Sequence, residues 1–387
     1  MTDTAHVHTT MAPTTIEALV AEGQSAWQDD LTRAQLTSGE LRRSIDEIGI
    51  RGLTSNPTIF AKAMDAGDAY DEQIATLLRG GMGAAEVFEV IAVQDVRDAC
   101  ELFRPLYDAT AGRDGFVSIE VSPAAARDPR ATRVEARRLW QAIARPNLMV
   151  KIPGTVEAAP VIEELLTAGI NVNITLLFSL AAYERVARAY VAALERRRAA
   201  GQPIDRVASV ASFFVSRVDT QVDRLLDEEI ATAQDELTSE WLSSLKGKAA
   251  IANAKLAYAR FQEIFTGQGF AKLRAQGADV QRPLWASTSV KNPAYRDVRY
   301  VEELIGPNTV NTMPRATVEA FLDHGVVRRT VDRDIDEARF NIQELAAAGI
   351  DLDAVARQLE AEGIALFAES YGNLLRTIDV RRETLAA

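Results

Sequence analysis

Eight short apolar runs alternate with helical segments along most of this 387-residue chain. The runs cover residues 25–30, 52–56, 116–121, 148–152, 170–178, 207–215, 283–288 and 308–313. Strands that alternate with helices form parallel sheets, and eight such units without a change of pattern favour a closed barrel over an open doubly wound sheet. We therefore predict an α/β fold, a (β/α)8 TIM barrel, over residues 15–325.

Three segments lie outside this repeat. The stretch 218–275 is helical, charged and longer than one crossover requires, so we expect a helical insertion around residues 225–275. Residues 326–387 show no further strand pattern, and we expect C-terminal helices that pack on the barrel and partly cover its mouth. Residues 1–14 are polar and rich in threonine, which predicts a disordered tail.

Composition narrows the class of protein. The formal net charge of −12 disfavours binding to nucleic acid or to an anionic membrane. Cys100 is the only cysteine and the three histidines are scattered, so neither an intrachain disulfide nor a Cys/His metal site is expected. The N-terminus lacks the pattern of a signal peptide, and polar residues interrupt the longest apolar region, 170–182. We expect a cytoplasmic protein without metal, membrane or nucleic-acid partners.

Lys151 places an amine inside the apolar run 148–152. An unpaired buried charge is costly, so buried lysines are normally paired or give up their proton more readily. A neutral lysine amine can attack a carbonyl and form a Schiff base, which then serves as an electron sink for making or breaking a carbon–carbon bond. The simpler alternative is a lysine that marks the solvated end of a strand and pairs with a carboxylate.

Polar residues also mark the ends of most other predicted strands. In a barrel of this kind, reactive groups gather where the strands end. These positions are held by Asp29, Asn56, Glu120, Asn173, Thr175, Ser212, Arg217, Ser287 and Lys291. One polar group at a strand end is ordinary, but a group at nearly every end predicts a pocket, and it favours the reactive interpretation of Lys151.

Four segments resemble one enzyme family. They are residues 52–60 (GLTSNPTIF), 150–154 (VKIPG), 169–179 (GINVNITLLFS) and 286–293 (ASTSVKNP), and in this order they resemble the transaldolases, in the longer form typical of bacteria. The resemblance runs over about residues 20–320. It implies a class I aldolase barrel that moves a dihydroxyacetone unit from a ketose phosphate to an aldose phosphate, in the non-oxidative pentose phosphate pathway.

The resemblance assigns the chemistry to four residues. Lys151 matches the lysine that attacks the C2 carbonyl of sedoheptulose 7-phosphate or fructose 6-phosphate. Asp29 matches the acid/base that takes the C4 hydroxyl proton, whereas strand alternation points its neighbour Asp30 the other way. Glu120 and Thr175 match the pair that holds the catalytic water, although Glu120 could be only the ion-pair partner of Lys151. The lysine imine is itself the electron sink, so no cofactor is expected.

Four further residues match contacts with the dihydroxyacetone unit. Asn56 and Asn173 match residues that hold its hydroxyls. Ser212 would also contact it, and Phe214 would supply an apolar wall. Asn56, which precedes a proline, could instead be a simple turn residue.

Three residues correspond to the phosphate site of the family. Arg217 and Ser287 match it directly, while Lys291 stands about where the shorter enzymes have a second arginine. Lysine binds phosphate as a point charge and not as a bidentate fork. Two alternatives to phosphate binding stay open. Arg217 could form an ion pair with Asp219 or Asp223, and Ser287 could be an ordinary helix-capping residue.

Two rival functions compete with a transferase. One is an aldolase on the same barrel that releases free dihydroxyacetone; such relatives are usually much shorter and often carry a tyrosine in the acid/base network, so length favours the transferase. The other is an inactive barrel that serves as a scaffold, which leaves the set of strand-end residues unexplained. We expect sugar phosphates as partners and a monomer or homodimer.

Overall fold

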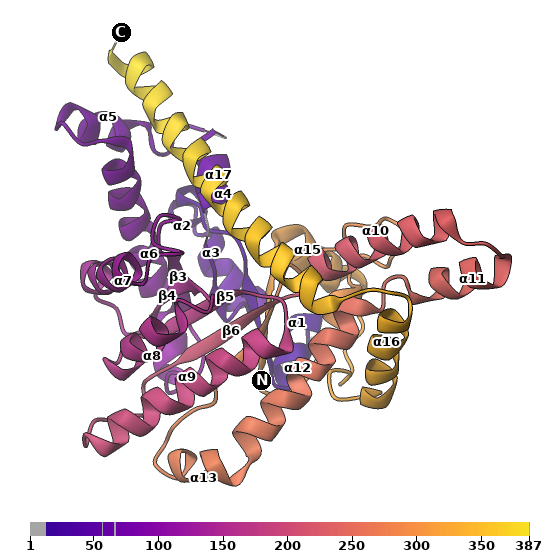
Figure 1. Cartoon of the computed structure of the whole chain (residues 1–387). Helices are drawn as coiled ribbons and strands as arrows, with labels where there is room; N and C mark the ends of the chain where they lie inside the picture. Colours follow the sequence, from indigo (N-terminus) through magenta and orange to yellow (C-terminus); the bar gives the residue numbers. More distant parts are fainter. Residues whose placement is uncertain (1–12, 56, 66, 387) are drawn as a thin grey trace, which may run out of the picture.

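The computed structural model describes residues 13–55, 57–65 and 67–386 (Figure 1). Its strands form one closed parallel barrel in the order of the sequence. They are β1 (Gln24–Gln28), β2 (Gly52–Leu53), β3 (Phe116–Glu120), β4 (Leu148–Pro153), β5 (Val172–Leu177), β6 (Ser209–Phe214), β7 (Arg282–Ala286) and β8 (Thr309–Met313). The predicted TIM barrel is confirmed. Residues 1–12, most of the tail that we expected to be disordered, lie outside the described residues.

Helices surround the barrel on the outside and at one end (Figure 1). They are α1 (Thr15–Ala21), α2 (Arg33–Thr37), α3 (Glu40–Arg43), the π-helical turn η1 (Ser44–Ile48), α4 (Pro57–Asp65), α5 (Asp71–Arg79), α6 (Ala84–Ala109), α7 (Pro129–Ile143), α8 (Ala159–Thr167), α9 (Leu180–Ala199), α10 (Ser216–Thr232), α11 (Glu236–Leu245), α12 (Ala249–Thr266), α13 (Gln268–Arg274), α14 (Arg299–Glu302), α15 (Arg315–His324), α16 (Ile335–Ala347) and α17 (Leu352–Ala386). None of the helices in the described part of the chain combines the length and apolarity needed to cross a lipid bilayer.

The middle of the barrel is an apolar plug. Side chains at alternate strand positions point inward, and those at mid-barrel are buried and in contact with one another. They are Trp27, Phe116, Met149, Val210, Leu284 and Val310. Gly52 on β2 makes room for this layer, because a Cβ added to it would lie 2.5 Å from the indole ring of Trp27.

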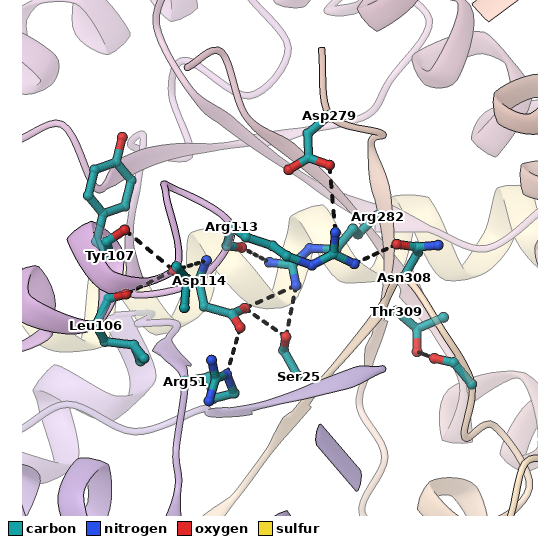
Figure 2. A network of polar contacts seen from close by, with 12 residues as sticks. Ser25, Arg51, Leu106, Tyr107, Arg113, Asp114, Asp279, Arg282, Asn308 and Thr309 are labelled. Atoms are coloured by element: carbon teal, nitrogen blue, oxygen red, sulfur yellow. Dashed lines mark hydrogen bonds and ion pairs between the residues drawn. The ribbon is translucent and has the colours of Figure 1, made fainter. Parts of the chain in front are cut away.

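A buried ionic network closes the N-terminal end of the barrel (Figure 2). One carboxylate oxygen of Asp114 accepts hydrogen bonds from Ser25 Oγ at 2.7 Å and Arg282 Nη1 at 3.0 Å, and the other accepts one from Arg51 Nε at 2.6 Å. Burial alone would raise the pKa of the Asp114 carboxyl, but Arg282, Ser25 and Arg51 outweigh burial and lower the pKa. Buried side chains that pair with one another therefore fill this end of the barrel.

The long helix α17 lies over the C-terminal end of the barrel (Figure 1, yellow). Its 35 residues pack against α4, α5, α6, α10 and β5. Gly363 of α17 meets the barrel closely, since a Cβ there would lie 2.9 Å from Leu176 Cδ2. Tyr371 packs edge-on against Phe88 of α6, with ring centroids 5.7 Å apart. The last helix thus forms one wall of the barrel mouth.

Candidate active site

A cavity of about 420 Å³, lined by both polar and apolar side chains, opens at the C-terminal ends of the strands, beside α17. Nine of the residues predicted for the site line it together: Asp29, Glu120, Lys151, Thr175, Ser212, Phe214, Arg217, Ser287 and Lys291. Asn56 lies outside the described residues. Asn173 is fully buried behind the cavity wall.

Lys151 and Glu120 form a buried pair at the bottom of the cavity. They are register partners on β4 and β3, and Lys151 Nζ lies 3.1 Å from Glu120 Oε2. Their side chains are 12% and 8% exposed. Burial raises the pKa of the Glu120 carboxyl, and the charge of Lys151 opposes this effect only in part. The amine therefore sits beside a carboxyl group that can exchange a proton with it.

Asp29 follows β1 directly and faces the cavity. Its backbone N–H donates to Met313 O at 2.9 Å, which extends the strand by one residue. Its Oδ1 accepts a hydrogen bond from Thr54 Oγ1 at 2.7 Å, and Thr54 also contacts the hydroxyl of Thr312 at 2.9 Å. Asp30, by contrast, accepts a hydrogen bond from Gln35 and does not line the cavity. The geometry separates the two neighbouring carboxylates as strand alternation predicts.

The hydroxyl of Thr175 is unsatisfied. It is buried, lines the cavity and has no hydrogen-bond partner among the described residues. The next residue, Leu176, has a left-handed φ of 59°, at the point where the pairing of β5 with β6 shifts register. Buried hydroxyls are normally satisfied, so this one marks a place for a water molecule or a substrate hydroxyl.

Asn173 lies within the wall of the cavity and contacts two serine side chains. Its Nδ2 donates to Ser118 Oγ at 3.0 Å, and its Oδ1 accepts from Ser212 Oγ at 2.7 Å. It is the register partner of Lys151. In this arrangement Asn173 fixes the orientation of Ser212, which does line the cavity.

The other end of the cavity is cationic. Arg217, the second residue of α10, lies over the ring of Phe214 with 5.7 Å from guanidinium carbon to ring centroid. Burial lowers the pKa of Arg217, and burial together with the charge of Arg217 lowers the pKa of Lys291. Ser287, with φ 56°, places its hydroxyl 3.0 Å from that of Ser216. Two neighbouring cations with hydroxyls beside them favour an anion such as a phosphate group.

The carboxylates considered as partners of Arg217 are engaged elsewhere. Asp219 accepts hydrogen bonds from Tyr300 Oη and the backbone N–H of Ala250, and Asp223 accepts them from Tyr295 Oη and the N–H of Gly247. Burial raises the pKa of Asp219 to about 6. Within the described part of the chain, no carboxylate lies at ion-pair distance from Arg217, and the charge of Glu362 on α17 opposes the effect of burial on its pKa only in part. Asp219 and Asp223 are thus bound to groups outside the cavity, and neither pairs with Arg217.

Sequence reasoning missed several lining residues. Thr54 and Thr312 support Asp29 from two neighbouring strands, and both sit at inward-facing positions near strand ends. The rule that polar residues at strand ends line the pocket could have found both threonines. Lys62 of α4 and Phe367 of α17 also line the cavity. A rule based on strand ends cannot find them, because both residues come from helices.

Comparison with known proteins agrees with this geometry. The family model "Transaldolase/Fructose-6-phosphate aldolase" matches residues 26–378. The transaldolase of Saccharopolyspora erythraea is 48% identical over 364 residues, which cover 94% of this chain and 96% of that protein. The transaldolase of Trichodesmium erythraeum is 46% identical over 365 residues, with the same coverage of both chains. The chain therefore belongs to the transaldolase/fructose-6-phosphate aldolase family.

Proposed function

We propose that this protein is a transaldolase, a transferase that moves a dihydroxyacetone unit between sugar phosphates. The reaction takes the unit from sedoheptulose 7-phosphate to glyceraldehyde 3-phosphate and gives erythrose 4-phosphate and fructose 6-phosphate. The observation that carries the proposal is the buried pair of Lys151 and Glu120, in a cavity that also holds Asp29 and a cationic end. The relatives named transaldolase match this chain over nearly its whole length.

The first half of the reaction forms the Schiff base. The amine of Lys151 adds to the C2 carbonyl of the ketose, and the carbinolamine then loses water to give an iminium ion. Glu120, 3.1 Å from the amine, is placed to carry protons in these steps. The unsatisfied hydroxyl of Thr175 offers a hydrogen bond to the water that is lost and later returns.

The second half breaks and remakes a carbon–carbon bond. Asp29 takes the proton of the C4 hydroxyl, the C3–C4 bond breaks, and its electron pair moves into the iminium to give an enamine on Lys151. The aldose phosphate leaves. The enamine carbon attacks the aldehyde of the acceptor, Asp29 returns the proton to the new hydroxyl, and water releases the ketose product and the free amine.

The other residues of the site hold the substrate. Arg217, Lys291 and Ser287 would bind the phosphate group at the cationic end. Ser212, held by Asn173, would bind a hydroxyl of the dihydroxyacetone unit, while Phe214 supplies an apolar wall.

An aldolase that releases free dihydroxyacetone is the alternative. Two observations favour the transferase. No tyrosine lines the cavity among the described residues, and α17 supplies a wall that includes Leu366 and Phe367. A covered mouth retains the enamine until an acceptor arrives and limits its loss to water.

The test compares transfer with release. Fructose 6-phosphate is incubated with and without erythrose 4-phosphate, and sedoheptulose 7-phosphate and free dihydroxyacetone are both measured. A transaldolase gives sedoheptulose 7-phosphate with the acceptor and little dihydroxyacetone without it. Equal release of dihydroxyacetone in both samples would assign the chain to the aldolases, and no product in either sample would favour the scaffold.

A matched pair of variants tests the acid/base assignment. Asp29→Asn should lower kcat by about 10²–10⁴-fold, the usual range for loss of a general acid/base. Asp30→Asn removes the same charge one residue away and should retain most of the activity, since Asp30 faces Gln35 and not the cavity. Equal losses in both variants would contradict the assignment.

Two further properties belong to this proposal. We place the protein in the cytoplasm, in keeping with its net charge of −12 and its phosphorylated substrates. We expect a monomer or homodimer. Cell fractionation and light scattering test these two points.

A further inference from the structure

A second polar cavity, of about 520 Å³, lies away from the barrel mouth. It is formed by the first turns of α12 and α16, the α14 region and the segment 328–334. None of its lining residues lines the active-site cavity. Its volume falls within the ordinary range for small-molecule sites.

Six cationic side chains line this second cavity, against three carboxylates. The cations are Lys248, Lys255, Arg299, Arg328, Arg329 and Arg333. The whole chain carries a net charge of −12, so this local excess of positive charge runs against its composition. Within the described part of the chain, the side chains of Lys248, Arg328 and Arg333 have no ion-pair partner. Half of the cations are therefore available to a ligand.

Lys255 is buried, and its one ion-pair partner is distant. Its side chain is 8% exposed, and its Nζ lies 3.6 Å from Glu303 Oε2, which is longer than a hydrogen bond. A buried ammonium group is normally paired at hydrogen-bond distance. An anion bound in the cavity would give the ammonium group of Lys255 a second partner.

The N-terminus of α12 adds to the positive field, whereas Asp336 and Glu337 in the first turn of α16 offset the dipole of that helix. The cavity is lined by residues of the first two turns of both α12 and α16. No side chain caps the start of either helix. The positive ends of helix dipoles favour phosphate groups, and arginine and lysine side chains bind the same groups.

We propose that this cavity binds a small metabolite that carries at least two phosphate groups, at a site separate from the catalytic cavity. Lys255 and Lys248 hold one phosphate from the α12 side, and Arg328 and Arg333 hold another from the segment before α16. Ile251, Ala252 and Ala338 provide an apolar surface for the organic part of the ligand.

The test uses inorganic pyrophosphate as the probe, in calorimetric titrations of the full chain at about 0.15 M salt, where the Debye length is about 8 Å. All titrations are done in an Arg217→Gln background, which weakens phosphate binding in the catalytic cavity. In this background pyrophosphate should still bind, and inorganic phosphate should bind at least about tenfold more weakly, because it makes fewer charged contacts.

Two double variants then locate the site. Arg328→Gln with Arg333→Gln should weaken pyrophosphate binding by at least about tenfold. Arg42→Gln with Arg198→Gln removes the same charge from two exposed positions outside both cavities and should leave binding within about twofold. All four arginines are exposed, so the fold should tolerate their loss.

Three results would overturn the proposal. They are no binding of pyrophosphate in the Arg217→Gln background, equal binding after the loss of Arg328 and Arg333, or an equal loss in the control pair. Equal affinity for phosphate and pyrophosphate would refute the claim of two phosphate groups.

Discussion

The ionic network at the closed end of the barrel should stabilise the fold without affecting the chemistry. The change that tests this is Asp114→Asn, which keeps the size of the side chain and one acceptor oxygen but removes the charge. Within the described residues, Arg51 and Arg282 each form an ion pair with Asp114 and with no other carboxylate. The variant therefore leaves two arginines without a counter-charge, and the Arg282 side chain is only 7% exposed.

The loss in free energy of unfolding and the resulting change in Tm can both be estimated. Breaking a buried pair by removing one partner costs about 3–5 kcal/mol. With an unfolding entropy of about 2.1 cal/mol/K per residue, the 387-residue chain has a total of about 0.8 kcal/mol/K. A loss of about 4 kcal/mol should then lower Tm by about 5 °C. Asp98→Asn, at an exposed position of α6, is the matched control and should change stability by less than about 0.5 kcal/mol.

Urea unfolding at several pH values is the assay. The folded-state pKa of Asp114 is lowered, so its contribution is fully present above the unfolded value of about 3.8 and disappears as pH falls through the lower folded value. The difference between wild type and Asp114→Asn should be constant near neutral pH and shrink below about pH 4. The kcat at 25 °C should stay within about twofold. A difference below about 1 kcal/mol, or a large loss of kcat in the folded variant, would refute the separation of the stabilising end from the catalytic end.

Three other substitutions probe particular contacts. Gly52→Ala puts a methyl group against the Trp27 ring and should cost about 1–3 kcal/mol; an unchanged Tm would contradict the close packing of this layer. Thr175→Val should leave stability within about 1 kcal/mol, since the hydroxyl has no protein partner, but should lower kcat by about 10²-fold; full activity in steady-state assays would remove Thr175 from the mechanism. Phe367→Ala takes away part of the α17 wall and should raise KM for fructose 6-phosphate about threefold to tenfold with a smaller change in kcat; an unchanged KM would show that α17 does not contact substrate.

The barrel could be predicted because alternation of strand and helix is a local pattern, and eight such units without a change of pattern favour a closed barrel over an open sheet. The same regularity predicted that Lys151, Glu120 and Asp29 lie near one another, and all three line one cavity. Strand boundaries were less accurate. The run 52–56 was predicted as a strand, whereas β2 is only Gly52–Leu53, because the segment beyond leads directly into α4.

The support around the site could not be read from the sequence. The engagement of Asp219 and Asp223 depends on Tyr300 and Tyr295, which lie more than 70 residues away along the chain. The place of Asn173 in the wall depends on Ser118 of another strand. Such pairings come from tertiary packing, and a single sequence carries no signal for them.

The position of α17 is a further case. We expected the helices after the barrel to cover part of its mouth, and residues of α17 line the cavity there, but the sequence did not predict which face of α17 meets the barrel. That face depends on Gly363, where the absence of a Cβ allows a close approach to Leu176. A glycine within a long helix is a signal for such an approach only once the partner is known.

The most direct test of the mechanism is to trap the Schiff base. The protein is treated with borohydride in the presence of fructose 6-phosphate, and wild type and Lys151→Ala are compared by peptide mass spectrometry. The account predicts a reduced three-carbon dihydroxyacetone adduct on Lys151 in the wild type and none in the variant. An adduct on another lysine, or none in an active wild-type enzyme, would contradict it.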